Sequence, residues 1–265
     1  MIGSVIMKFY SFGNSEKPVI MLIAGTCCHW KSSFKEVIPL LKESFYVVCV
    51  SYDGFDETEN TIFTTMLDQT QKIEHYILRH FNGKIFAVYG CSLGGSIVGL
   101  LIHRGVIHME HGILGSSDLD QGGVLAGNVL SKLVCTMVYP IYRTGRLPNY
   151  MKKKIAKDTD GEYMKKMVSM MGLGEDRQVD MSFVKPESIK NQFLSDYVTP
   201  LPLSIDVAGT TVHCFYATKM GAKYLSRYQR HFKNPDIVYH NLQHEELLVC
   251  YPEKWVSEVR RCCNV

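Results

Sequence analysis

The chain has 265 residues, which is enough to bury the core of one large domain. With 46% hydrophobic and 21% charged residues it has the composition of an ordinary globular protein, and its net charge of only +3 argues against a dedicated nucleic-acid-binding protein. The N-terminus lacks a basic stretch followed by a sustained apolar one, and no run of 18 apolar residues occurs. We therefore expect neither secretion nor a transmembrane segment.

Nine cysteines are present, an odd number without a repeating spacing. Several lie inside apolar runs, which is typical of reduced thiols and indicates a cytoplasmic protein. The adjacent pairs Cys27-Cys28 and Cys262-Cys263 lack a second Cys or His pair at the spacing of a zinc site. We therefore expect no metal.

In chain order, apolar runs predict strands and apolar residues at helical spacing predict helices between them. The expected strands are 4–12, 18–24, 45–52, 84–89 and 110–116, and the expected helices are 32–43, 61–81 and 94–101. Pro39 is expected to kink the first helix. This alternation predicts an α/β fold with a mostly parallel, doubly wound sheet and helices on both faces.

The pattern changes in the segment 121–204, where helix-like stretches rich in methionine are interrupted by glycines and prolines. Twelve Lys and Arg stand there against eight Asp and Glu. The simplest interpretation is an inserted helical cap that divides the core into 1–120 and 205–265. Its methionines either line an adaptable apolar pocket or, as is commoner, pack helices together. Strands at 211–217 and 236–242 and helices at 221–232 and 245–262, the last of which is expected to restart at Pro252, complete the core.

The sequence Gly90-Cys91-Ser92-Leu93-Gly94 lies between a predicted strand and a predicted helix. Small residues two positions before and two after a serine allow the sharp turn of a nucleophile elbow, which lifts the hydroxyl above the sheet. The alternative is a purely structural turn. Five letters are weak evidence on their own, but the strand before and the helix after favour a catalytic Ser92.

A nucleophilic serine needs a base and hydrogen-bond donors for the oxyanion. His244 follows the last predicted strand and precedes the last helix, so it is the candidate base, unless it is a capping or surface histidine. His240 is a weaker rival. The backbone N–H of Leu93 is one expected donor, and that of Thr26, with Cys27 or Cys28 as alternatives, is the other.

The elbow, the Tyr52-Asp53-Gly54 turn and the His244-Glu245-Glu246 segment together resemble the α/β-hydrolase superfamily of serine esterases, lipases and peptidases. The resemblance covers nearly all of the chain outside the cap. It implies a triad in the order Ser, acid, His. The turn 218–221, where the family commonly carries the acid, has no carboxylate. Some relatives carry it one strand earlier, which makes Asp118 the first choice and Asp120 the second, unless they cap the next segment.

These observations predict a serine hydrolase, of carboxylesterase or lipase type, acting on a small or medium hydrophobic ester through an acyl-enzyme. The catalytic residues would be Ser92, His244 and Asp118, with oxyanion donors at Leu93 and Thr26, and no cofactor. The partner would be a small-molecule acyl substrate. Two alternatives stay open: an acyltransferase on the same fold, or a ligand-binding protein that has lost turnover.

Overall fold

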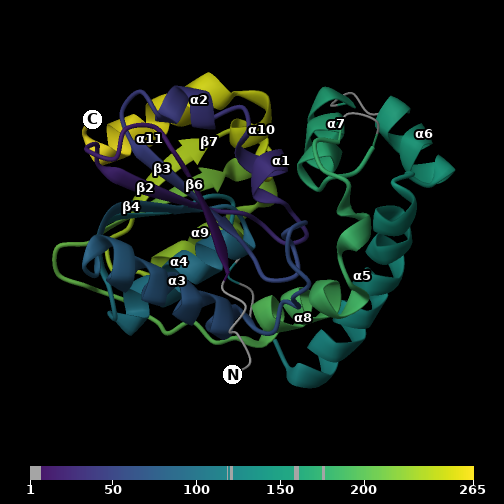
Figure 1. Ribbon diagram of the computed structural model, residues 1–265, viewed down its shortest axis with the longest axis horizontal. Helices are drawn as coiled ribbons and strands as arrows, with labels where there is room; N and C mark the ends of the chain where they lie inside the picture. Colours follow the sequence, from purple (N-terminus) through teal and green to yellow (C-terminus); the bar gives the residue numbers. More distant parts are fainter. Residues whose placement is uncertain (1–6, 118, 120–121, 158–160, 175–176) are drawn as a thin grey trace.

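A single sheet runs through the centre of the computed structural model, which describes residues 7–117, 119, 122–157, 161–174 and 177–265 (Figure 1). Within these residues seven strands form the order β1-β3-β2-β4-β5-β6-β7. All neighbours pair in parallel except β1, which runs antiparallel to β3 at the edge. The strands are β1 (Lys8–Phe12), β2 (Val19–Ile23), β3 (Tyr46–Ser51), β4 (Lys84–Gly90), β5 (His108–Leu114), β6 (Thr211–Ala217) and β7 (Asp236–His240).

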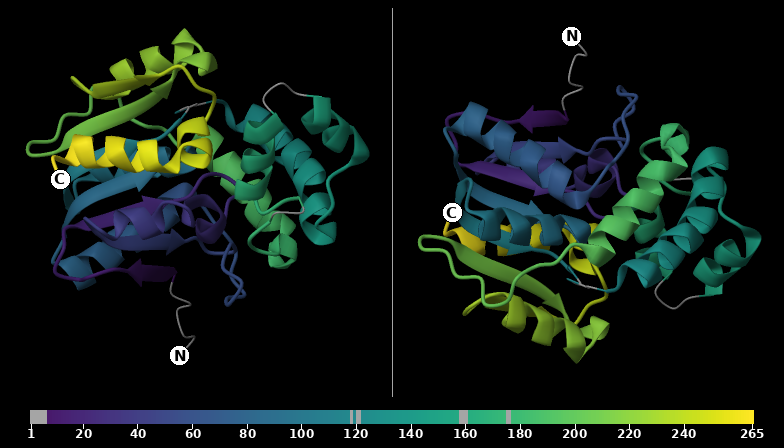
Figure 2. Two further views of the ribbon diagram at one scale, coloured as in Figure 1. Left: turned by 90° about the horizontal axis from the view of Figure 1, so that it is seen from above. Right: turned by 90° about the horizontal axis from the view of Figure 1, so that it is seen from below.

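Helices cover both faces of this sheet (Figures 1 and 2). One face carries α1 (Trp30–Phe34), α2 (Ile38–Leu41) and α11 (Pro252–Cys263), with the short α10 (Glu246–Cys250) ahead of α11. The other carries α3 (Met66–Phe81), α4 (Leu93–Arg104) and α9 (Ala222–His231). The predicted doubly wound α/β architecture is therefore confirmed.

The central strands are apolar along their whole length because both of their faces are covered. Ile20, Met21, Leu22 and Ile23 of β2 are completely buried, as are Ala87 and Val88 of β4. Because these side chains are buried and apolar, none of them can act on a ligand in the middle of the sheet. Function must therefore lie in the loops at the strand ends, where parallel strands expose their carboxyl termini together.

The helix expected at 32–43 is divided, because α1 ends at Phe34 and α2 begins at Ile38. Pro39 is one of the first residues of α2, a position where its missing N–H would have no helical partner. The final helix is divided in the same way at Pro252, which begins α11. Proline thus starts new helices here rather than kinking existing ones.

Between β5 and β6 the chain forms α5 (Val124–Thr144), α6 (Asn149–Lys157), α7 (Gly161–Met170) and α8 (Pro186–Val198), which lie to one side of the sheet (Figure 1). We call the stretch Val124–Val198 the helical insertion. At its base the N–H of Gly122 donates to the carbonyl of Tyr197 at 2.8 Å. The 21 residues of α5 continue through Pro140, where the sequence pattern had predicted shorter, interrupted helices.

Candidate functional site

Ser92 lies on a sharp turn between β4 and α4. Its backbone has φ 48° and ψ −111°, which a non-glycine residue adopts only under strain. The turn is closed by the N–H of Gly94, which donates to the carbonyl of Cys91 at 2.7 Å, and by that of Gly95, which donates to Ser92 at 2.9 Å. Strain of this kind, about 1–3 kcal/mol per residue, is typical of functional sites.

Glycine is required on both sides of Ser92 because the backbone approaches itself closely. A Cβ on Gly90 would stand 2.1 Å from the carbonyl carbon of Gly94. A Cβ on Gly94 would stand 2.3 Å from the carbonyl oxygen of Ile23, at the end of β2. The Gly-x-Ser-x-Gly spacing therefore reflects packing of the turn against the neighbouring strand, which holds Ser92 at the carboxyl edge of the sheet.

Glu245, to which the sequence analysis gave no role, lies directly against this turn. Its Oε1 accepts hydrogen bonds from the backbone N–H of Ser92 at 3.1 Å and of Ser116 at 2.7 Å, and its Oε2 accepts one from the Tyr89 hydroxyl at 3.0 Å. The residue is only 3% exposed and has φ 54°. Its own N–H donates to Ser116 Oγ at 2.9 Å. A buried carboxylate thus joins the loops that follow β4, β5 and β7.

This contact locates the segment that carries His244. Adjacent Cα atoms are about 3.8 Å apart, so the backbone of His244 lies beside a residue that touches the amide of Ser92. The carbonyl of His244 accepts a hydrogen bond from Tyr163 of α7 at 3.0 Å, which fastens the same segment to the helical insertion. That the imidazole serves Ser92 as a base stays a prediction. No sequence pattern marked Glu245, except that it follows the candidate histidine.

The loop after β2 was expected to supply an oxyanion donor from Thr26, Cys27 or Cys28. Two of these amides are engaged: Cys27 N–H donates to Gln192 Oε1 at 2.7 Å, and Cys28 N–H donates to the carbonyl of Gly25 at 3.3 Å. Gln192 belongs to α8, and Tyr142 of α5 donates its hydroxyl proton to the carbonyl of Cys27. The helical insertion therefore holds the peptide of Cys27, and Thr26 stays the predicted donor.

Leu93 is the first residue of α4, so its N–H has no acceptor within the helix. That amide also lies at the positive end of the helix dipole, where developing negative charge is stabilised. These properties fit the predicted role of Leu93, which stays a prediction.

Asp118 and Asp120, the candidate acids, lie outside the described residues. Asp236 begins β7, as expected from the sequence, and so lies at the opposite edge of the sheet from Ser92. There its carboxylate approaches His213 Nδ1 at 2.8 Å.

Among the described residues, His213, Asp236 and Cys262 are one group whose ligand atoms are close enough to hold a metal ion. His213 also pairs with His111 at 3.2 Å, so its two ring nitrogens have partners within the protein.

Two cysteines beside the turn, Cys28 and Cys91, have thiols of low reactivity. Burial, and next the Glu245 carboxylate, raise the pKa of Cys28 to about 12, and the same two causes raise the pKa of Cys91 well above its usual value. Both therefore stay protonated at neutral pH. The adjacent Ser92 is half-buried, and so its hydroxyl is the more accessible nucleophile of the turn.

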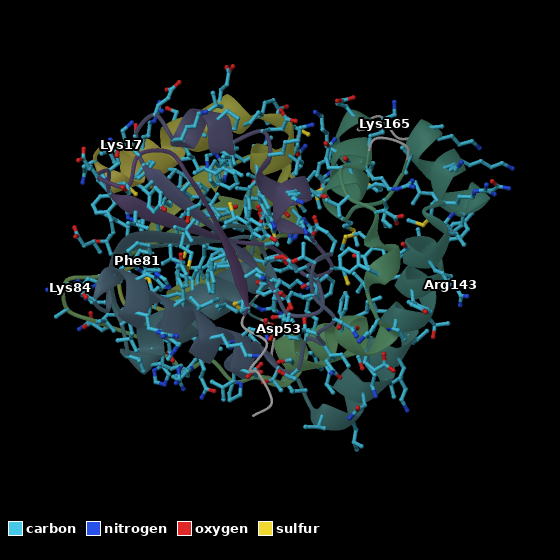
Figure 3. The ribbon with its side chains drawn as sticks, viewed as in Figure 1. Lys17, Asp53, Phe81, Lys84, Arg143 and Lys165 are labelled. Atoms are coloured by element: carbon cyan, nitrogen blue, oxygen red, sulfur yellow. The ribbon has the colours of Figure 1, made fainter. Side chains whose placement is uncertain are left out.

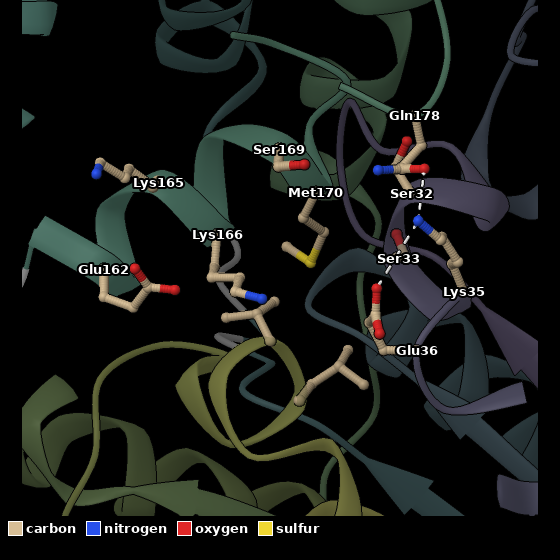
Figure 4. A pocket seen from close by; sticks show the side chains of 12 residues that line it. Ser32, Ser33, Lys35, Glu36, Glu162, Lys165, Lys166, Ser169, Met170 and Gln178 are labelled. Carbon is tan, nitrogen blue, oxygen red and sulfur yellow. Dashed lines mark hydrogen bonds and ion pairs between the residues drawn. The ribbon is translucent and has the colours of Figure 1, made fainter. Parts of the chain in front are cut away.

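A cavity of about 310 Å³ lies between the core and the helical insertion (Figure 4). Its wall includes Ser32 and Ser33, which follow the Thr26 loop, and Leu248, which follows the His244 loop. Lys35 of the core reaches Gln178 of the insertion at 2.8 Å on one side of it. Cavities that bind small molecules start at about this size.

No protein-family model matches the chain, and no curated protein matches it in sequence. Solved structures do match. One is a protein from Desulfitobacterium hafniense described as an alpha/beta hydrolase family member, at 19% identity and TM-score 0.73, covering 96% of this chain and 99% of that one. A second is a thermophilic esterase from Thermogutta terrifontis, at 16% identity and TM-score 0.69, covering 96% of this chain and 92% of that one. A third is the enol-lactonase of Burkholderia xenovorans LB400, at 15% identity and TM-score 0.67, covering 98% of this chain and 96% of that one. The chain therefore has the α/β-hydrolase fold.

Proposed function

We propose that this protein is a serine hydrolase that cleaves carboxylic esters through an acyl-enzyme. One observation supports the proposal: the carboxylate of Glu245 binds the N–H of Ser92, so the backbone segment that carries His244 lies beside the nucleophile turn. The strained backbone of Ser92 and the N–H of Leu93, which has no acceptor within α4, agree with it. So do the esterase and enol-lactonase among the structural neighbours.

In the proposed reaction, Ser92 Oγ attacks the ester carbonyl while His244 accepts its proton. The N–H groups of Leu93 and Thr26 stabilise the oxyanion, and His244 then protonates the departing alcohol. Water, deprotonated by His244, attacks the acyl carbonyl, and His244 returns the proton to Ser92 Oγ as the carboxylic acid leaves. Asp118 would orient the imidazole and stabilise its charged form. Glu245 contacts the backbone of the turn and acts in this scheme as a positioning residue.

The substrate we propose is a small or medium ester. The 310 Å³ cavity is bordered by the segments that follow both predicted catalytic loops, but neither Ser92 nor His244 lines it, so the substrate size rests on the sequence and not on this cavity. Because the enol-lactonase cleaves a cyclic ester by its name, lactones belong in the substrate panel beside linear esters.

The test is labelling of the purified protein with a fluorophosphonate probe, followed by assays with nitrophenyl esters of graded chain length and with lactones. We expect labelling and turnover that Ser92→Ala abolishes. Ser96→Ala is the matched control, because Ser96 is a second serine of the same region, buried on α4. It should leave labelling unchanged. An unlabelled wild-type protein, or one labelled equally after Ser92→Ala, would contradict the proposal.

A further inference from the structure

The outer face of α5 is an exposed apolar surface. Leu125 is 85% exposed and Leu133 is 55% exposed, although both are large hydrophobic residues. The apolar face of α5 consists of Leu125, Val129, Leu130, Leu133 and Met137. Leu125, Val129, Leu133 and Met137 recur every four residues and Leu130 precedes Leu133 by three, so they lie along one side of the helix. Large hydrophobic residues exposed along one side of a helix are typical of an interaction site.

The opposite side of α5 packs against α8. Gly127 and Ser131 are buried there, and a Cβ on Gly127 would meet Leu194, Tyr197 and Val198 of α8 at 3.0–3.1 Å. The helix is thus apolar on both sides but packed on only one, and 17% of its most apolar stretch is buried. By length and composition α5 could cross a bilayer. Because one side is committed to α8, it is suited to lie on a membrane surface instead.

The charge of the segment around α5 indicates what kind of partner binds the apolar face. Residues 122–157 contain seven Lys or Arg, four of them on α6, and no Asp or Glu. Since the whole chain carries +3, all other residues together carry −4. Lys132 and Arg143 belong to α5 itself, and Figure 3 places Arg143 at the side of the molecule away from the sheet. A surface that combines an apolar helix face with an excess of cations is complementary to anionic lipid headgroups.

We propose that the protein binds the surface of bilayers that contain anionic phospholipids. The apolar face of α5 enters the boundary between headgroups and acyl chains, and the cations of α5 and α6 contact the phosphates. A second copy of the chain fits this face less well, because a two-fold dimer would bring the same cationic segment of each copy together. The inference concerns binding alone and stands apart from the proposed hydrolysis.

Flotation with two kinds of vesicle tests the proposal: phosphatidylcholine alone, and phosphatidylcholine with about 30% phosphatidylglycerol. We expect binding to the anionic vesicles that weakens in high salt, and much less binding to neutral ones. Leu125→Ser/Leu133→Ser should weaken binding by about tenfold or more. The control is Leu67→Ser/Leu78→Ser on α3, whose leucines are 40% and 45% exposed, and it should bind like the wild type.

A second pair of variants separates charge from apolar contact. Lys152→Gln/Lys153→Gln removes two exposed cations of α6 and should lower both the affinity for anionic vesicles and its salt dependence. Failure to bind anionic vesicles would overturn the proposal, as would equal binding to both vesicle types or unchanged binding by Leu125→Ser/Leu133→Ser. So would a dimer, seen by sedimentation without lipid, that the same substitution dissociates. Labelling of Ser92 is measured without vesicles, so the two proposals fail independently.

Discussion

Ser92 and Glu245 both hold a backbone conformation with positive φ, and one hydrogen bond joins them. A buried carboxylate is stable only when its oxygens receive enough donors, and here Ser92, Ser116 and Tyr89 supply three. The two strained residues are therefore mutually dependent. Glu245 fixes the direction of the Ser92 peptide, and the turn satisfies the charge of Glu245.

We predict that Glu245→Ala lowers kcat by about 10–100-fold with little change in KM, because the nucleophile turn loses its fixed orientation. It should also lower the free energy of unfolding by about 3 kcal/mol, since two buried N–H groups lose their acceptor. Glu245→Gln retains an oxygen for these groups and should recover most of the activity. Ester kinetics and urea denaturation measure both effects.

Glu246→Ala is the control for this series. Glu246 is also buried, but its Oε2 accepts from the N–H of Gln243 rather than from the turn. Its removal should leave kcat within about twofold of the wild type. Equal kcat values for Glu245→Ala and the wild type would refute a positioning role.

Cys28 gives a prediction about pH. With its pKa raised to about 12 by burial, and next by Glu245, only roughly one molecule in ten thousand carries the thiolate at pH 8. Iodoacetamide at pH 8 should therefore leave Cys28 unmodified and the activity intact. The thiolate fraction increases tenfold per pH unit below the pKa, so alkylation should become faster towards pH 10 and be rapid in urea. Mass spectrometry of the alkylated peptide measures this, and fast modification of the native protein at pH 8 would contradict it.

At the scale of elements, α8 links the helical insertion to two parts of the core. Gln192 accepts from the amide of Cys27, whose φ is 57°, while Ser188 and Asn191 bind the backbone of Phe63 at 3.2 and 3.0 Å. One helix therefore supports the candidate oxyanion loop and also anchors the insertion. Its position influences the site although it carries none of the predicted catalytic residues.

We predict that Gln192→Ala lowers kcat/KM by about tenfold, because the Cys27 N–H loses its acceptor and the strained loop relaxes. Gln192→Glu keeps an acceptor oxygen and should be less harmful. Asn191→Ala is the matched control on the same helix, since it removes a contact with Phe63 and leaves Cys27 alone. The idea is refuted if both alanine variants have the same kcat/KM.

Hydrophobic patterning was sufficient to predict the strands of the core, because parallel strands covered on both faces are continuously apolar. It missed the division of the segment 32–43 into α1 and α2. It failed for α5, where Pro140 and the glycines suggested breaks although tertiary packing on α8 maintains one helix. The elbow was predictable because its glycines are required by close backbone contact. The role of Glu245 was not predictable, because its partners Ser92, Ser116 and Tyr89 are more than a hundred residues away in sequence.

At the scale of the whole molecule, the fold separates the two proposed tasks, hydrolysis and membrane binding. The sheet and its flanking helices present Ser92 and the loop of Glu245 at one edge, and the insertion between β5 and β6 adds contacts to that edge from one side (Figure 1). Charge follows the same division, because the helical insertion has 12 Lys and Arg against 8 Asp and Glu, a net charge of +4, whereas the rest of the chain carries −1. The predicted catalytic residues all come from the core, and the exposed apolar helix comes from the insertion.

The hydrogen bond between Gly122 and Tyr197 holds the two ends of the helical insertion side by side. An element whose entry and exit points coincide can be exchanged for another of different length without moving the scaffold that bears it. Selectivity in this architecture is consequently modular: grafting a foreign segment at this one junction offers a route to new substrates while the strands beneath keep their register.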